Sequence, residues 1–261
     1  MSTAIEVGLN AAVVSCTSET PSVLVTAGVA LDSLPFGPFD PLRHRTMEVS
    51  LRASVAEQTG LSLGYVEQLY TFGDRGRHAQ AGDTSPHVMS VGYLALTRIP
   101  EGTEETPKVR FRSWYRYFPG EDARGGRPEA IDAVILPRLA SWAAEAIGRA
   151  ERVRHLFGDG VPFDEEKVLE RYELLYEAGL VEEAARDGRA SDPGVTLGLP
   201  MRFDHRRILA TAMGRLRAKM KYRPVVFELM PESFTLTELQ HTVEAIAGQH
   251  LHKQNFRRLV E

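Results

Sequence analysis

Five polar residues near the C-terminus have the chemistry needed to read DNA. They are Lys253, Gln254, Asn255, Arg257 and Arg258. Arg, Gln and Asn can form paired hydrogen bonds with base edges in the major groove, and Lys and Arg also neutralise backbone phosphates. Helical spacing would turn Phe256, Leu259 and Val260 inward and leave the polar residues outward. The pattern predicts a recognition helix, and the alternatives are a solvated helical face or a dimer surface.

The segment before it predicts the first helix of a helix-turn-helix. Thr235 and Glu238 have the spacing of a capping box, and Gly248 is expected to end this helix. The residues expected to face inward are Leu236, Leu239, Val243 and Ile246. Thr237 and Gln240 are expected to face outward near the helix start, where a DNA phosphate can meet them.

The charge distribution fits the same interpretation. Residues 201–261 contain eleven Lys and Arg against six Asp and Glu, whereas the whole chain carries a net charge of −4. A basic tail on an acidic body is typical of a nucleic-acid-binding module, and a solvated cationic face is the alternative. No apolar stretch is long enough to span a bilayer, the N-terminus lacks a signal peptide's basic start, and Cys16 stands alone. A cytoplasmic protein with no membrane partner is expected.

A second stretch has the spacing of metal-dependent chemistry. A helix is expected from Thr46 to Glu57, and carboxylates at positions i, i+3 and i+4 of one helix face can hold Mg²⁺ beside a diphosphate. Residues 34–61, LPFGPFDPLRHRTMEVSLRASVAEQTGL, resemble the Nudix box, whose helix carboxylates bind Mg²⁺ to cut nucleoside-linked diphosphates. The closing Glu57-Gln58-Thr59-Gly60-Leu61 fixes the register.

In that register most of the motif is replaced. The substituted positions are Phe39, Arg45, Ala53, Ser54 and Gln58. Of the metal-binding carboxylates only Glu57 remains, and one carboxylate cannot orient Mg²⁺ against a diphosphate. We therefore expect no catalysis and no metal, but a retained cleft for a nucleotide diphosphate. The alternatives are a plain amphipathic helix, or a relocated metal site using Glu48 and Glu67.

The surrounding pattern predicts a mixed sheet with helices on both faces. The expected strands cover residues 5–16, 22–27, 65–72, 87–96 and 109–118. The expected helices cover residues 128–157, with a kink or new start at Pro137, then Asp164 to Gly179, and a third helix capped by Asp204. Residues 185–194 are the expected linker.

The C-terminal sequence FELMPESFTLTELQHTVEAIAG, followed by KQNFRR, resembles the winged-helix domain of the Nudix-related regulators of NAD metabolism. DHRRILATAMGRLRAKMKYRPVVF resembles that family's linking helix and first strand, and VEQLYTFGD resembles a strand of its Nudix-like domain. The long middle region resembles the longer branch described as NAD regulators in alphaproteobacteria.

This resemblance implies an α+β fold: an N-terminal Nudix-like α/β/α sandwich with a mixed sheet, then a C-terminal winged helix-turn-helix. The wing is expected to be missing, because the sequence stops at Glu261; either the chain was shortened before it or the protein lacks one. The expected parts are a ligand-sensing domain at 1–157, a helical extension and linker at 158–200, and a DNA-binding domain at 201–261.

The resemblance also implies a homodimeric repressor of genes for NAD biosynthesis or salvage. It would bind a double-stranded DNA operator and sense an adenine nucleotide such as ADP-ribose, NAD or ATP, with no catalytic cofactor. The candidate ligand-binding residues are Phe36, Gly37, Phe39, Glu57, Phe72, Asp74, Arg75, Arg77, Arg110 and Arg112. The candidate DNA-binding residues are Thr237, Gln240, Lys253, Gln254, Asn255, Arg257 and Arg258.

Two other functions stay open at this point. One is a hydrolase of nucleoside-linked diphosphates, similar to ADP-ribose pyrophosphatase, with an unusual metal site. The other is an interaction module whose tail docks on a protein partner. The lost carboxylates count against the first, and the positive charge of the tail counts against the second.

Overall fold

The computed structural model describes residues 5–17, 19–27, 31–74, 87–99, 109–158, 160–189, 191–192, 194–195, 197–252, 254 and 256. The strands are β1 (Ile5–Cys16), β2 (Pro21–Ala27), β3 (Asp32–Ser33), β4 (Phe36–Pro38), β5 (Val66–Phe72), β6 (His87–Leu96) and β7 (Val109–Ser113). Together they form one sheet in the order β3-β2-β1-β6-β5, with β4 paired to β1 and β7 paired to β2. β1 and β6 are parallel and the other pairs are antiparallel, so the predicted mixed sheet is confirmed.

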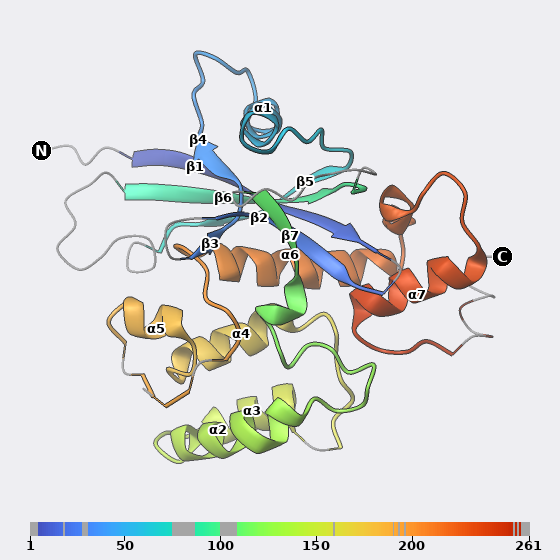
Figure 1. Ribbon diagram of the computed structural model, residues 1–261. Helices are drawn as coiled ribbons and strands as arrows, with labels where there is room; N and C mark the ends of the chain where they lie inside the picture. The colour runs from blue at the N-terminus through green and yellow to red at the C-terminus, as the bar shows by residue number, and fades with distance from the viewer. Residues whose placement is uncertain are drawn as a thin grey trace, which may run out of the picture.

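Helices cover both faces of this sheet (Figure 1). The α-helices are α1 (Met47–Thr59), α2 (Leu136–Ala143), α3 (Arg149–Phe157), α4 (Val168–Glu177), α5 (Glu182–Arg186), α6 (His205–Met220) and α7 (Leu236–Ala247). Short turns of other helix types are η2 (Trp114–Arg116), η3 (Ile131–Ile135) and η4 (Val225–Leu229). α1 lies on one face of the sheet and α6 on the other, with α4, α5 and then α2 and α3 stacked beyond α6. In the described part of the chain, no helix is both long and apolar enough to cross a membrane.

β1 shows why the sheet needs both layers. Its side chains alternate between the two faces: Leu9 and Val13 pack in one core with α1, whereas Ala12 and Val14 pack in the other core with α6. Because both faces are buried, the strand reads as a nearly continuous apolar run instead of an alternating one. This arrangement confirms the expected sandwich.

Local end signals decide where α1 begins and ends. The Thr46 side chain accepts a hydrogen bond from the Val49 N–H, and Gly60 closes the helix with a φ of 73°. A residue with a side chain adopts such a φ only at a cost, so glycine suits this position. The helix expected from residue 46 onward is confirmed.

Four expectations about secondary structure were wrong. The strand expected over 109–118 ends at Ser113 and turns into η2. The helix expected over 128–157 is interrupted between α2 and α3, where Gly148 has a φ of 86°, although Pro137 does mark a new start at the first turn of α2. The apolar run at 225–229 is a 3-10 helix and not a strand. Asp204 precedes α6 without a side-chain cap, because its carboxylate pairs with Arg207 instead.

The main hydrophobic core extends across the domain boundaries expected at residues 157 and 200. It joins Val14 of β1, Tyr172 of α4, Leu216 of α6 and Phe256. Part of the expected linker 185–194 is also packed: the Arg186 side chain donates to the Met201 and Phe203 carbonyl oxygens. The domain boundaries themselves stay a prediction.

Candidate ligand and DNA-binding sites

On α1, two positions expected to correspond to Nudix metal ligands make neutral contacts, one of them with β4. The Gln58 amide donates to Ser54 Oγ at 2.8 Å and to the Phe36 carbonyl at 3.0 Å. A Cβ on Gly37 would lie 2.7 Å from Ser54 Oγ, so a larger residue at position 37 would force the Ser54 hydroxyl to move. Glu57 is exposed on the same helix. Ser54 and Gln58 therefore connect α1 to β4 with hydrogen bonds between neutral groups.

The two carboxylates considered for a relocated metal site are engaged by cations. Glu48 pairs with Arg52 at 2.9 Å. Glu67 pairs with Lys219 at 2.6 Å and accepts a hydrogen bond from Tyr65 at 2.7 Å. Burial alone would raise the pKa of Glu67, but the bonds from Lys219 and Tyr65 outweigh it and lower the pKa. Among the residues that the structure places, no group of three or more His, Cys, Asp or Glu is arranged to hold a metal ion.

The two arginines expected to meet phosphates converge on a carboxylate that sequence reasoning missed. Arg110 and Arg112 lie on one face of β7, and both pair with Asp32, at 3.1 and 3.0 Å. The Tyr117 hydroxyl also donates to Asp32, at 2.7 Å. Burial, together with this hydrogen bond to a carboxylate, raises the pKa of Tyr117. We call Asp32, Arg110, Arg112 and Tyr117 the Asp32 cluster.

The two candidate stacking aromatics, by contrast, are not brought together. Phe36 meets Phe203 edge-to-face at 5.6 Å between ring centroids, and the Arg202 guanidinium lies 4.6 Å from the centroid of the Phe203 ring. Phe39 packs instead with the core on the α1 side of the sheet. Phe203 has a φ of 50°, which is strained for a bulky residue, and such strain tends to collect at ligand-binding sites.

The end of β5 is tied to the start of α6. Arg207 pairs with Asp74 at 2.5 Å, and its guanidinium lies 5.3 Å from the centroid of the buried Phe72 ring. The Arg202 N–H donates to the Asp32 carbonyl at 2.9 Å. Residues 201–207 thus contact Phe36, Phe72, Asp74 and the Asp32 cluster, although they lie far from these groups in sequence. Arg75 and Arg77 lie outside the described residues.

At the C-terminal end, the predicted capping box of α7 is confirmed. Thr235 Oγ1 accepts from the Glu238 N–H at 3.2 Å, and Glu238 accepts from the Thr235 N–H at 2.6 Å. Thr237 is exposed in the first turn, as expected for a phosphate contact. Gly248 closes the helix with a φ of 72°.

The expected outward orientation of Gln240 was wrong, because its amide is used inside the helix-turn-helix. It donates to Glu244 at 2.8 Å and to the Leu251 carbonyl at 3.2 Å. Glu244 also accepts from the Leu251 N–H at 3.0 Å and contacts His250 at 2.9 Å. Gln240 and Glu244 therefore fix the turn after α7, a role that the sequence pattern alone did not reveal.

The second helix is described at its first turn only. The Phe256 N–H donates to the His252 carbonyl at 3.0 Å, and Phe256 is buried, as expected. Gln254 is exposed. The remaining DNA-binding candidates lie outside the described residues: Lys253, Asn255, Arg257 and Arg258. Beside this turn lies a groove of about 790 Å³, between the end of α6, η4 and α7, lined in part by Leu239, Val243 and Phe256.

We predict that Thr235→Ala destabilises the chain by about 1 kcal/mol, because α7 loses its N-cap. Urea unfolding of the full chain measures this change. Thr237→Ala, also exposed on the same first turn, is the control and should change stability by about 0.5 kcal/mol or less. Equal stability of Thr235→Ala and the unmodified chain would contradict the role of the cap.

Residues 226–261 match the model of the NrtR DNA-binding winged helix domain. The C-terminal segment is NrtR-like in sequence and is similar to a winged-helix domain. The likeness to solved structures extends over nearly the whole chain: the crystal structure of Shewanella oneidensis NrtR aligns with a TM-score of 0.58 at 19% identity, covering 97% of this chain and 82% of that one. A MutT/nudix family protein from Enterococcus faecalis aligns with a TM-score of 0.57 at 17% identity, covering 99% of this chain and 81% of that one. At such identities these two structures support the NrtR-like fold and nothing more.

One curated relative is the ADPR responsive transcriptional repressor NtrR of Acinetobacter baylyi. It is 47% identical over 62 residues, which is 24% of this chain and 25% of the relative. The matched part therefore spans about a quarter of that repressor's length.

Proposed function

We propose that the chain is a DNA-binding transcriptional repressor of genes for NAD biosynthesis or salvage, and that it senses ADP-ribose. The observation that carries this proposal is the C-terminal match at 226–261, together with 47% identity to a repressor described as ADPR responsive. The structure adds a formed capping box and an ordered turn after α7. The Shewanella oneidensis protein of similar fold has been crystallised with a 27mer DNA.

The chain acts as a homodimer in this proposal, in the cytoplasm. Two recognition helices related by a twofold axis would meet two half-sites about one DNA turn apart, or a multiple of that distance. Ligand binding changes DNA affinity only if ADP-ribose binds one arrangement of the helices more tightly than the other.

The Nudix-related part binds its ligand without hydrolysing it. Ser54 and Gln58 occupy two carboxylate positions and bond to each other, so they cannot supply the charge that Mg²⁺ requires beside a diphosphate. The segment that leads into α6 places Phe203 and its neighbour Arg202 beside Phe36, and the first turn of α6 places Arg207 beside Asp74. We propose that this region contacts the nucleotide, with an aromatic ring for the adenine and guanidinium groups for the phosphates.

We predict that ADP-ribose stabilises the chain and is recovered intact. At about 100 times its dissociation constant, a ligand bound only by the folded state adds about 2.7 kcal/mol of stability. A thermal-shift titration measures the first effect, and chromatography after incubation with Mg²⁺ measures the second. Chromatography should also recover intact ADP-ribose after incubation with Glu57→Gln.

Release of AMP by the unmodified chain, abolished by Glu57→Gln, would establish the hydrolase instead. DNA binding is tested separately by a gel-shift assay on DNA upstream of NAD-biosynthetic genes. Absence of a shifted complex at low salt would contradict the repressor.

A further inference from the structure

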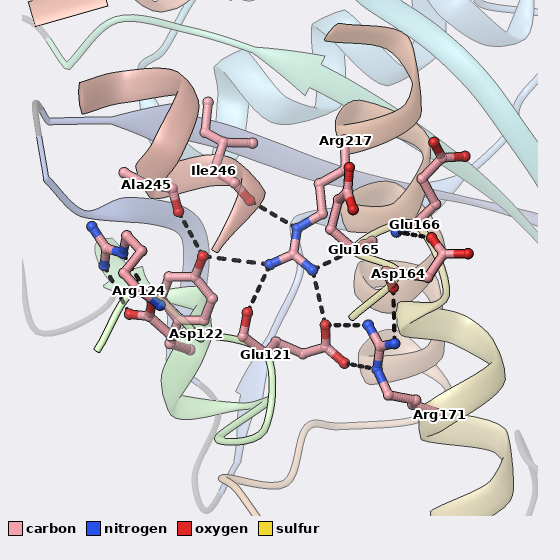
Figure 2. A network of polar contacts seen from close by, with 11 residues as sticks. Glu121, Asp122, Arg124, Asp164, Glu165, Glu166, Arg171, Arg217, Ala245 and Ile246 are labelled. Carbon is pink, nitrogen blue, oxygen red and sulfur yellow. Dashed lines mark hydrogen bonds and ion pairs between the residues drawn. The ribbon is translucent and has the colours of Figure 1, made fainter. Parts of the chain in front are cut away.

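Glu121 lies at the centre of a buried ion cluster that has no contact with those candidate ligand residues that the structure describes. Its carboxylate accepts two hydrogen bonds from Arg171 of α4, at 2.5 and 2.7 Å, and one from Arg217 of α6, at 2.8 Å (Figure 2). The exposed fractions of these three residues are 4%, 3% and 1%. Burial alone would raise the pKa of Glu121, but the two guanidinium groups outweigh it and lower the pKa.

The cluster reaches the C-terminal end of α7. Arg217 Nε donates to the Ile246 carbonyl at 2.8 Å, and the Tyr115 hydroxyl donates to the Ala245 carbonyl at 2.6 Å. The Ala123 N–H donates to the Gly248 carbonyl at 2.7 Å. The last carbonyls of a helix have no partner inside it, and a cation is favourable there. Figure 2 shows the Arg217 guanidinium between Glu121 and the Ile246 carbonyl at the end of α7. The body of the protein thus caps the first helix of the helix-turn-helix.

The segment 109–124, which contacts the end of α7, also contacts the candidate ligand site. Arg110, Arg112 and Tyr117 bind Asp32, while Tyr115, Glu121 and Ala123 serve the α7 end. Both sets of contacts lie within residues 110–123 and alternate along the chain. Tyr115 and Tyr117 are only two residues apart, but Tyr115 contacts α7 and Tyr117 contacts Asp32. One short segment therefore contacts both the Asp32 cluster and the end of α7.

We propose that residues 109–124 are the link through which the Asp32 cluster positions the DNA-binding helices, with Tyr115 and Glu121 as the positioning residues. The part concerning DNA rests on the function proposed above. The part concerning α7 rests on the contacts alone.

At Gly248, the end of α7 packs closely against Tyr115, Glu121 and Arg217. A Cβ on Gly248 would overlap the Glu121 carbonyl oxygen and lie 3.0 Å from both Arg217 Nη2 and the Tyr115 hydroxyl. Gly60 provides a matched control, because it closes α1 with nearly the same φ, 73° against 72°, and has open space around its Cβ position. Gly248→Ala and Gly60→Ala thus share the backbone strain and differ in the contact.

Hydrogen–deuterium exchange of the full chain tests this contact without DNA or ligand. Gly248→Ala should speed exchange both in α7 and across residues 115–124, whereas Gly60→Ala should affect α1 only. Faster exchange confined to the last turn of α7, with residues 115–124 unchanged, would overturn the proposal.

A milder pair of variants retains the fold. Tyr115→Phe removes one hydroxyl bond to α7, and Tyr176→Phe removes a comparable bond to Asp187 at 2.9 Å, away from α7. The loss of one such bond should speed exchange across residues 236–248 about 2- to 10-fold in Tyr115→Phe, and leave it unchanged in Tyr176→Phe. Equal exchange of α7 in the two variants would overturn the positioning role.

The final measurement is the ratio of DNA affinities with and without ADP-ribose, by fluorescence anisotropy. In Tyr115→Phe this ratio should move toward one, while ADP-ribose affinity stays within about 3-fold, the change expected where no ligand contact is lost. An unchanged ratio would overturn the link. If the unmodified chain binds no DNA, the proposed function fails, and the exchange comparison still decides whether residues 109–124 position α7.

Discussion

Glu121→Ala is expected to lower the free energy of unfolding by about 3–5 kcal/mol, because it leaves two buried guanidinium groups without their carboxylate. Arg171 and Arg217 keep bonds to backbone carbonyls, but these carry no net negative charge to balance them. Urea unfolding at neutral pH, followed by circular dichroism, measures the loss.

Asp122→Ala is the matched control at the next residue. The Asp122 carboxylate also forms a two-pronged pair with an arginine, Arg124, at 2.8 Å for each bond, but about a third of its side chain is exposed. An exposed pair of this kind contributes about 1 kcal/mol or less. Similar losses in the two variants would show that burial does not distinguish the Glu121 cluster from a surface pair.

Arg258→Ala is expected to weaken operator binding by about 1–3 kcal/mol, or roughly 5- to 150-fold, if this side chain pairs with a base edge. ADP-ribose affinity should not change, because the residue belongs to the predicted recognition helix. Fluorescence anisotropy with operator DNA measures the first quantity, and calorimetry measures the second.

Arg45→Ala is the control, since it removes the same charge from an exposed position before α1. It should change DNA affinity much less than Arg258→Ala does. Equal DNA affinity of Arg258→Ala and the unmodified chain would exclude Arg258 from the interface. Equal weakening by both substitutions would point to general electrostatic attraction instead of a specific contact.

Features set by neighbouring residues could be predicted from the sequence. The capping box of α7 depends on Thr235 and Glu238, three residues apart, and the end of α1 depends on Gly60. The β1–β2 pairing follows from two apolar runs separated by a polar turn. In each case the interacting groups lie close enough in the chain for their spacing to carry the information.

Features set by distant residues were missed. Asp32 and Arg110 are 78 residues apart, and Glu121 and Arg217 are 96 apart. Neither pair has a local pattern, because side chains that meet only after folding leave no period in the sequence. The same reason explains Gln240: its residue type suits DNA, but the position of the Leu251 carbonyl decides where its amide points.

The position of α6 has a consequence for how such proteins can diversify. This helix covers one face of the sheet through Ile208, Leu209 and Met213, and it also supports α7 through Arg217. The sheet region and the helix-turn-helix region therefore share α6, and a division at residue 200 would not separate them. A boundary that keeps the contacts of α6 with the sheet lies after this helix, between residues 221 and 225. Even there, a replacement C-terminal segment must place helix-end carbonyls where they can accept hydrogen bonds from Arg217 and Tyr115. Substitutions in either region are thus constrained by the other.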